Sequence, residues 1–245
     1  MRAAKLVLLL IAVIAGAAAM HAENQIKLVR QPFANGEAIK LNVQAQEQMR
    51  KGDLTSAERS VALAMQKDST LWLNYYMRGR LFVREHKYEL AIQDCNWVLR
   101  KYPKFIEAAL LRANANAHLG RYGDSLKELD HVVRIRPAPD SYARALQARA
   151  WFLATCPNSS FRNGGQAARD AKIACKLTTW NDADTIDTLA AAYAETGDFD
   201  SAIRYAEQAL AVKGISPESA KLFREHLMWF QQRRRFPSSN KTEKI

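Results

Sequence analysis

A recurrence of small residues every 34 positions constrains the fold of this chain more than any other feature of its sequence. Three positions of the repeat show this recurrence. Followed through the first three repeats, the first position is Ala45, Gly79 and Ala113, the second is Ala57, Ala91 and Ser125, and the third is Ala64, Val98 and Val132. Two further repeats continue the three series at Ala148 and Ala190, Ala167 and Ala202, and Ala174 and Ala209. Small residues at matching places on two helices allow their backbones to approach closely. A period of this length predicts stacked helical hairpins.

The clearest repeat spans residues 186–210. Leu189, Ala190 and Tyr193 lie three and four positions apart and mark one face of a first helix. Gly197 tolerates the left-handed conformation that ends a helix, and Asp198 can cap the next one. The second helix carries its apolar face at Phe199, Ala202, Ala206 and Ala209. These residues predict a complete helix-turn-helix unit.

This pattern resembles the tetratricopeptide repeat, a helical hairpin of 34 residues that stacks into a solenoid. Pro103 and Pro137 occupy the terminal proline site of the second and third units. The resemblance covers residues 38–215 and implies an all-α solenoid of about five repeats, near 38–71, 72–105, 106–139, 140–182 and 183–215. Together with the N-terminal segment described below, it is typical of exported bacterial tetratricopeptide proteins of unassigned function.

Two repeats depart from the pattern. The second has His86 where glycine normally turns the chain. The fourth has 19 positions between Ala148 and Ala167 where the other repeats have 12, which predicts an insertion of seven residues. Turn-forming residues gather at 156–165, so we expect the insertion to form a loop between the two helices of that hairpin.

The first 22 residues have the pattern of a secretory signal peptide. Arg2 and Lys5 precede an uncharged run of 14 residues, Leu6–Ala19, and small residues at 17–22 offer a cleavage site. That run is shorter than the ~20 residues that a helix needs to span a bilayer. We therefore predict an exported chain, periplasmic or secreted, with no stable membrane insertion after cleavage. An uncleaved N-terminal anchor is the less favoured alternative.

Three segments flank the predicted solenoid. Residues 23–37 lack helical periodicity and are predicted to be a linker. Residues 216–235 are predicted to form a helix that covers the exposed end of the solenoid, as such folds require. Its apolar face is Ala220, Phe223, Leu227 and Phe230. Residues 236–245 are predicted to be a flexible tail.

The charge of the chain is unevenly distributed. Its formal net charge is +11, with 48% hydrophobic residues and few glycines and prolines, which favours a folded domain over a disordered one. Residues 72–139 hold 12 basic and 7 acidic residues, whereas residues 183–215 hold 2 and 6. A basic middle followed by an acidic repeat suits an oriented protein partner better than a uniform polyanion.

The three cysteines leave two possibilities open. Export would permit a disulfide between Cys156 and Cys175, with Cys95 unpaired. The expected helices place Cys156 and Cys175 roughly 13 Å apart at 1.5 Å per residue. This separation exceeds the ~7 Å between Cα atoms that a disulfide tolerates. Buried thiols are therefore the favoured interpretation.

No catalytic constellation is evident in the sequence. The five histidines, at positions 21, 86, 118, 131 and 226, have no spacing typical of a metal site. Gly164-Gly165 lacks the flanking residues of a phosphate-binding loop, and Cys156 has no neighbouring base. We expect a non-enzymatic protein without metal or cofactor.

The resemblance implies a partner-binding groove lined by the first helix of each repeat. The predicted groove residues are Arg50, Tyr76, Arg80, Arg84, Asn114, Tyr142, Arg149 and Phe152. The arginines could hold carboxylates of a bound segment, and the aromatic side chains offer apolar contact. The sequence thus predicts a scaffold of the bacterial cell envelope that binds a protein or peptide.

The alternative function is electrostatic binding to an anionic surface, such as a membrane, a cell-wall polymer or nucleic acid, through the basic repeats and the C-terminal tail. Nucleic acid is the less favoured of these ligands because aromatic residues are not interleaved with the basic ones. Self-association is also open.

Overall fold

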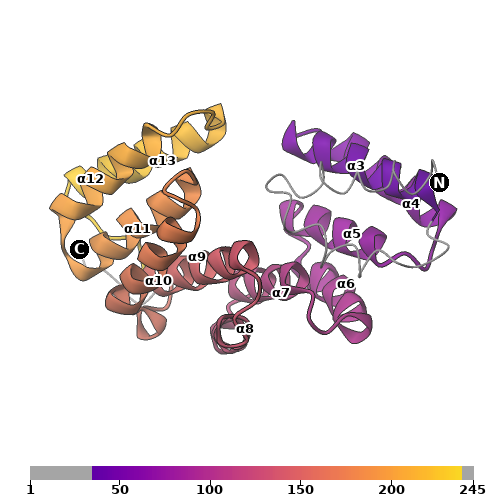
Figure 1. The fold of residues 1–245 in the computed structure, drawn as a ribbon, viewed down its shortest axis with the longest axis horizontal. Helices are drawn as coiled ribbons and strands as arrows, with labels where there is room; N and C mark the ends of the chain where they lie inside the picture. Colours follow the sequence, from indigo (N-terminus) through magenta and orange to yellow (C-terminus); the bar gives the residue numbers. More distant parts are fainter. Residues whose placement is uncertain (1–34, 239–245) are drawn as a thin grey trace, which may run out of the picture. The chain divides into compact units, whose positions relative to one another are not determined.

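The computed structural model describes residues 35–238. This part of the chain consists of eleven α-helices and one short 3₁₀ helix, without a strand (Figure 1). The predicted all-α fold is confirmed. The predicted signal peptide, most of the linker and tail residues 239–245 lie outside the described residues. Among the helices of residues 35–238, none combines the length and the apolar character needed to cross a membrane.

The chain divides into two compact units, one ending at Leu119 and the other beginning at Gly120. We call them the N-terminal unit and the C-terminal unit. The division falls inside the third predicted repeat. The first helix of that repeat therefore belongs to the N-terminal unit and the second helix to the C-terminal unit.

The described residues of the N-terminal unit, 35–119, form five helices, whose bounds are α3 (Gly36–Arg50), α4 (Leu54–Lys67), α5 (Trp72–Arg84), α6 (Tyr88–Lys101) and α7 (Ile106–His118). Helices α3 and α4 form one hairpin and α5 and α6 the next, and α7 packs on both α5 and α6. The small residue of each first helix is buried, as predicted. At Gly79, an added Cβ would already touch the Cβ of Asp94 at 3.5 Å. This is an ordinary van der Waals distance, so α5 and α6 approach as closely as a residue no larger than alanine allows.

Aromatic side chains fill the core between the hairpins of the N-terminal unit. The Trp72 ring packs edge-on against Tyr102 and Phe105, with centroids 5.8 and 4.7 Å apart. A buried amide pair joins α3 to α5, since Nδ2 of Asn42 donates to Oδ1 of Asn74 at 2.6 Å. Asn74 in turn donates to main-chain carbonyls at the end of α4. The two hairpins are thus joined by apolar packing and by a hydrogen-bonded link.

Residues 120–238 of the C-terminal unit form six α-helices and one 3₁₀ helix, whose bounds are α8 (Tyr122–Arg134), α9 (Pro139–Thr155), η1 (Ser159–Phe161), α10 (Gly164–Leu177), α11 (Ala183–Thr196), α12 (Phe199–Leu210) and α13 (Pro217–Gln231). Helices α9, α10 and α11 contact one another, and α13 packs on α11 and α12. Fully buried alanines dominate this core, among them Ala167, Ala171 and Ala190. Helix α13 lies where the capping helix is expected. Its residues Ala220, Phe223 and Phe230 are buried and Leu227 is partly buried.

Chain reversals within the repeats occur where the sequence pattern places them. Gly197 has a φ of 88°, and Asp198 accepts a hydrogen bond from the main-chain N–H of Ser201 at the start of α12. His86 has a φ of 59° and adopts the left-handed conformation in place of the usual glycine. The hairpin turn is therefore kept at His86 despite the strain that a side chain adds there.

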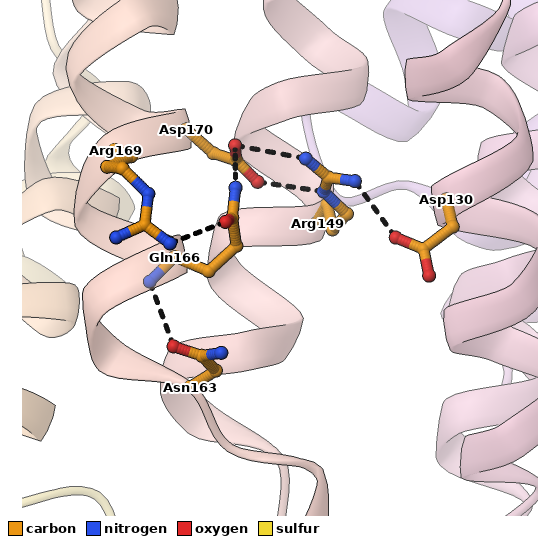
Figure 2. Close-up of polar contacts among 6 residues, drawn as sticks. All are labelled: Asp130, Arg149, Asn163, Gln166, Arg169 and Asp170. Atoms are coloured by element: carbon orange, nitrogen blue, oxygen red, sulfur yellow. Dashed lines mark hydrogen bonds and ion pairs between the residues drawn. The ribbon is translucent and has the colours of Figure 1, made fainter.

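The fourth repeat has a different register from the one predicted. Ala148 is only partly buried, whereas Ala150 is fully buried. Arg149 forms a bidentate ion pair with Asp170 across α9 and α10 (Figure 2). Arg78 forms the same kind of pair with Asp94 across α5 and α6. Arg78 directly precedes the small residue Gly79, so Ala150 is the equivalent small residue in the fourth repeat. The prediction that Ala148 is the small residue of the first helix of this repeat is wrong by two positions. The insertion is therefore two residues shorter than predicted.

The segments flanking the solenoid also differ from expectation. Helix α3 begins at Gly36, inside the stretch predicted to be a linker, because Asn35 accepts a hydrogen bond from the N–H of Glu37 and caps it. Phe236, at the start of the predicted tail, packs against side chains of α9 and α13. Residues 236–238 are therefore part of the folded C-terminal unit.

Candidate functional site

A stripe of three residues on α5 carries the strongest candidate site of the N-terminal unit. Tyr76, Arg80 and Arg84 are four residues apart and lie along one side of the helix. We call them the α5 stripe. The Arg80 guanidinium lies over the Tyr76 ring, 5.8 Å from its centroid. Tyr76 packs edge-on against Phe105, with centroids 5.0 Å apart. This packing holds the ring that supports the Arg80 guanidinium.

The two arginines of the α5 stripe lack acidic partners within residues 35–238. Arg84 donates from Nη1 to the main-chain oxygen of Met49 at 3.0 Å, which fixes it beside the end of α3. Arg80 makes a long contact with the sulfur of Met77 at 3.7 Å. Neither contact neutralises the positive charge. Both guanidinium groups can therefore donate hydrogen bonds to a carboxylate of another molecule.

Arg50 and Asn114 lie on the first helices that flank α5. Arg50 is exposed and pairs with Glu47 on its own helix, and the hydrogen bond from Arg50 lowers the pKa of Glu47 to about 2. Exposed pairs of this kind contribute little to stability, so Arg50 can exchange its partner. Asn114 is exposed on α7. Helices α3 and α7 both contact α5, so the predicted groove residues of the N-terminal unit lie on neighbouring helices.

In the C-terminal unit the predicted groove residues have structural contacts instead. Arg149 binds Asp170 and, at 2.9 Å, Asp130, as Figure 2 shows. Burial opposes the charge, but these carboxylates outweigh it and raise the pKa of Arg149. Phe152 is buried near Tyr122 and Phe161. The Arg149 charge is therefore not available to a partner, which corrects its predicted role.

The corrected register selects other side chains on α9. Tyr142 is partly buried near the start of α9 and moves out of the groove positions. Gln147 and Trp151 lie three positions before and one position after Ala150, as Tyr76 and Arg80 do around Gly79, and so take the groove positions of this repeat. Gln147 donates from Nε2 to Oγ1 of Thr188 on α11 at 3.0 Å. The face formed by α9 and α11 is thus lined by Gln147 and Trp151 rather than by Tyr142, Arg149 and Phe152.

Arg162, in the insertion loop, makes the largest set of polar contacts on this face. Its guanidinium pairs with Glu195 of α11 at 3.1 Å and donates to the main-chain oxygens of Cys156, Phe236 and Pro237 at 2.6, 2.9 and 2.6 Å. Only 5% of its side chain is exposed. The sequence pattern predicts only a turn in this loop and does not single out Arg162, because nothing local distinguishes it from a surface arginine.

An aromatic cluster lies beside Arg162. The Phe236 ring packs against Trp151 of α9 and against His226, Trp229 and Phe230 of α13, with centroids 4.9–6.2 Å apart. His226 is buried, and its Nδ1 lies 2.8 Å from Oδ2 of Asp187 on α11. Burial raises the pKa of Asp187, and the hydrogen bond with His226 opposes part of that rise. The chain's own segment thus covers the α9–α11–α13 face.

The described residues show no group of three or more His, Cys, Asp or Glu side chains that could hold a metal ion. Cys95, Cys156 and Cys175 are buried and unbridged. Burial and the charge of Asp182 raise the pKa of Cys175 to about 12, which is opposite to what a nucleophilic thiol needs.

Comparison with known proteins gives matches to repeat families. Residues 76–142 and 183–214 match family models of the tetratricopeptide repeat. Over 96 residues the chain is 30% identical to the tetratricopeptide repeat and J domain-containing co-chaperone DNJ1 of Cryptococcus neoformans. This match covers 39% of the chain and 18% of the co-chaperone, so the chain spans less than a fifth of that relative.

Solved structures of low sequence identity share the fold. TTC0263, a thermophilic TPR protein of Thermus thermophilus, aligns with a TM-score of 0.67 and 15% identity over 78% of this chain and 99% of its own. PilF of Pseudomonas aeruginosa aligns with a TM-score of 0.58 and 13% identity over 80% and 89%. A tetratricopeptide repeat protein of Parabacteroides merdae aligns with 0.52 and 20% over 81% and 75%. The chain therefore contains tetratricopeptide repeats at residues 76–142 and 183–214, and these solved structures share its fold.

Proposed function

We propose that this protein is a non-enzymatic scaffold that binds a protein partner through the α5 stripe and the neighbouring residues of α3 and α7. Tetratricopeptide folds are commonly protein-interaction scaffolds, and their first helices supply the binding surface. The observation that carries the proposal is the pair of arginines on the α5 stripe, which have no acidic partner in the described chain and adjoin an aromatic ring.

The partner segment that best fits this surface carries carboxylates and an apolar side chain. Two guanidinium groups about one helical turn apart can each form a forked hydrogen bond with a carboxylate. The Tyr76 ring, which packs on Phe105, offers an apolar contact next to these guanidinium groups. An acidic segment with one apolar anchor would therefore use all three residues of the α5 stripe.

Charge reversal tests the proposal against non-specific electrostatics. Arg80→Glu with Arg84→Glu should abolish capture of a partner that wild-type protein retains after crosslinking in its native cells. Arg59→Glu with Arg100→Glu changes the net charge equally, at exposed positions of the second helices α4 and α6. Loss with the first pair and retention with the second supports the proposal, and equal capture by all three proteins contradicts it. Equal loss with both pairs favours the alternative of binding to an anionic surface.

We also propose that the protein acts in the bacterial cell envelope. This proposal rests on the pattern of residues 1–22, in which a short basic region precedes an uncharged run. N-terminal sequencing of the protein from fractionated cells tests it. A mature chain that begins near residue 23 in the envelope fraction is expected, and an intact Met1 in the cytoplasmic fraction would contradict it.

A further inference from the structure

The segment that follows α13 lies on the C-terminal unit in the manner of a bound peptide. Helix α13 ends at Gln231, and Arg233 has a φ of 54°, a left-handed conformation that reverses the chain. Residues 234–238 are not helical. Phe236 then packs against Trp151, His226 and Trp229. A non-helical stretch is thus held against the face formed by α9, α11 and α13.

The contacts of this segment separate into general and specific ones. Arg162 donates to the main-chain oxygens of Phe236 and Pro237, which any peptide could supply. The Phe236 ring fills the aromatic cluster, and Nη1 of Arg235 lies 3.9 Å from Oε1 of Glu195. Pro237 needs no acceptor for an N–H and favours an extended conformation at Phe236. The specific features of the ligand are therefore a basic residue, an aromatic residue and a proline in succession.

Arg162 binds the main chain of the segment on this face. Its side chain is almost fully buried, and Glu195 and the oxygen of Cys156 provide its only other acceptors among the described residues. If the segment left, the cation would exchange two of its four acceptors for water and keep Glu195 and the oxygen of Cys156. Charge-assisted hydrogen bonds in a partly enclosed site are stronger than those to water. A peptide that supplies two carbonyl oxygens would therefore be favoured at this position.

The segment can leave without disturbing the helices. It contributes no residue to α9, α11 or α13, and these helices pack on one another through their own buried residues. Phe236 itself is only partly buried. Release therefore breaks the two hydrogen bonds from Arg162 to the segment and the ring contacts of Phe236, while the hairpins remain packed.

We propose that the surface formed by Trp151, Arg162, His226 and Trp229 is a second peptide-binding site, which takes an extended basic–aromatic–proline segment. Arg235–Phe236–Pro237 of the same chain occupies it as an intramolecular ligand. A partner segment of the same chemistry competes for the site. This site is distinct from the α5 stripe and does not depend on the function proposed for that stripe.

A labelled peptide with the sequence of residues 232–238 tests the proposal in fluorescence polarisation with the full chain. Phe236→Ala should vacate the site and bind the peptide about tenfold or more tightly than wild type, a difference of roughly 1.4 kcal/mol or more. Leu222→Ala, at an exposed position of α13, should match wild type. A peptide with alanine in place of its phenylalanine should not bind. Equal, weak binding by folded Phe236→Ala and wild-type protein would overturn the proposal.

A second measurement uses wild-type protein and so does not depend on the folding of a variant. Trypsin cleavage after Arg233, Arg234 and Arg235 should accelerate when excess peptide displaces the segment, provided that the peptide is made trypsin-resistant by N-methylation of the amide after each arginine, and the matching alanine peptide should leave the rate unchanged. No acceleration at a saturating peptide concentration would contradict the proposal. A dimer that forms with rising protein concentration and is lost in Phe236→Ala would also contradict it, because the segment would then be held by a second copy.

Discussion

Nδ1 of His226 lies 2.8 Å from Oδ2 of Asp187, and both side chains are almost fully buried between α13 and α11. His226→Ala should destabilise the protein by about 3–5 kcal/mol because it leaves a carboxylate in the core without its partner. Urea unfolding followed by circular dichroism measures the change in the free energy of unfolding. A loss below about 1 kcal/mol, the range of an exposed pair, would contradict this role for the pair.

The effect of His226→Ala should depend on pH. A carboxyl group whose pKa is higher in the folded state binds its proton more tightly there, so its contribution to stability rises as pH falls through the folded pKa. Burial raises the pKa of Asp187, and removing His226 takes away the contact that opposes the rise. The variant should therefore regain stability on acidification relative to wild type. Asp187→Asn with His226→Ala should lack this gain, and an identical pH profile for both variants would contradict the assignment to Asp187.

The corrected register of the fourth repeat predicts opposite outcomes for two alanines of α9. Ala150→Leu should destabilise the protein by about 1–3 kcal/mol, because the added side chain has no room in a packed core. Ala148→Leu should change stability by about 0.5 kcal/mol or less, because Ala148 is partly exposed. Thermal unfolding of the two variants provides the measurement. A larger loss at Ala148 than at Ala150 would restore the register inferred from the sequence.

Adjacent glycines at the start of α10 provide a second matched pair. A Cβ at Gly164 would lie 2.9 Å from the main-chain nitrogen of Thr196, whereas the nearest atoms at Gly165 are 3.7 Å away. Gly164→Ala should therefore destabilise by about 1–3 kcal/mol through forced displacement of α10 from α11. Gly165→Ala should be neutral or stabilising by up to about 1 kcal/mol. Equal effects in chemical denaturation would show that α10 and α11 do not approach this closely.

Thiol reactivity should distinguish the native protein from the unfolded one. All three cysteines are buried and unbridged, and the pKa of Cys175 is about 12. At pH 8 roughly one Cys175 in ten thousand would carry the reactive thiolate. Ellman's reagent should therefore report three thiols in non-reducing denaturant and a slow reaction of Cys175 in the native state. A single thiol in denaturant would indicate a disulfide and contradict the structure.

The sequence pattern was sufficient to predict the helical hairpins, because buried small residues recur where paired helices touch. It placed Ala45, Gly79 and Ala190 correctly. The pattern gave the wrong register at Ala148, because several alanines of α9 fit the spacing. Only the ion pair between Arg149 and Asp170 shows which of them is the small residue. Arg162 could not be found from the sequence because its importance comes from contacts with residues 33 and 74 positions away. Phe236 lies in a stretch without periodicity, so its packing depends on tertiary contacts alone.

A photocrosslinking amino acid at position 114 tests the central claim, that the first-helix face around the α5 stripe binds a protein partner. Asn114 is exposed on α7, which packs on α5, whereas Leu90 is exposed on the second helix α6. Each residue is replaced in turn with p-benzoylphenylalanine in the full chain, and native cells are irradiated. We expect a discrete protein adduct from position 114 that is lost when Arg80→Glu and Arg84→Glu are added, with no such adduct from position 90. The same adduct from both positions, or one that survives the charge reversal, would contradict the account.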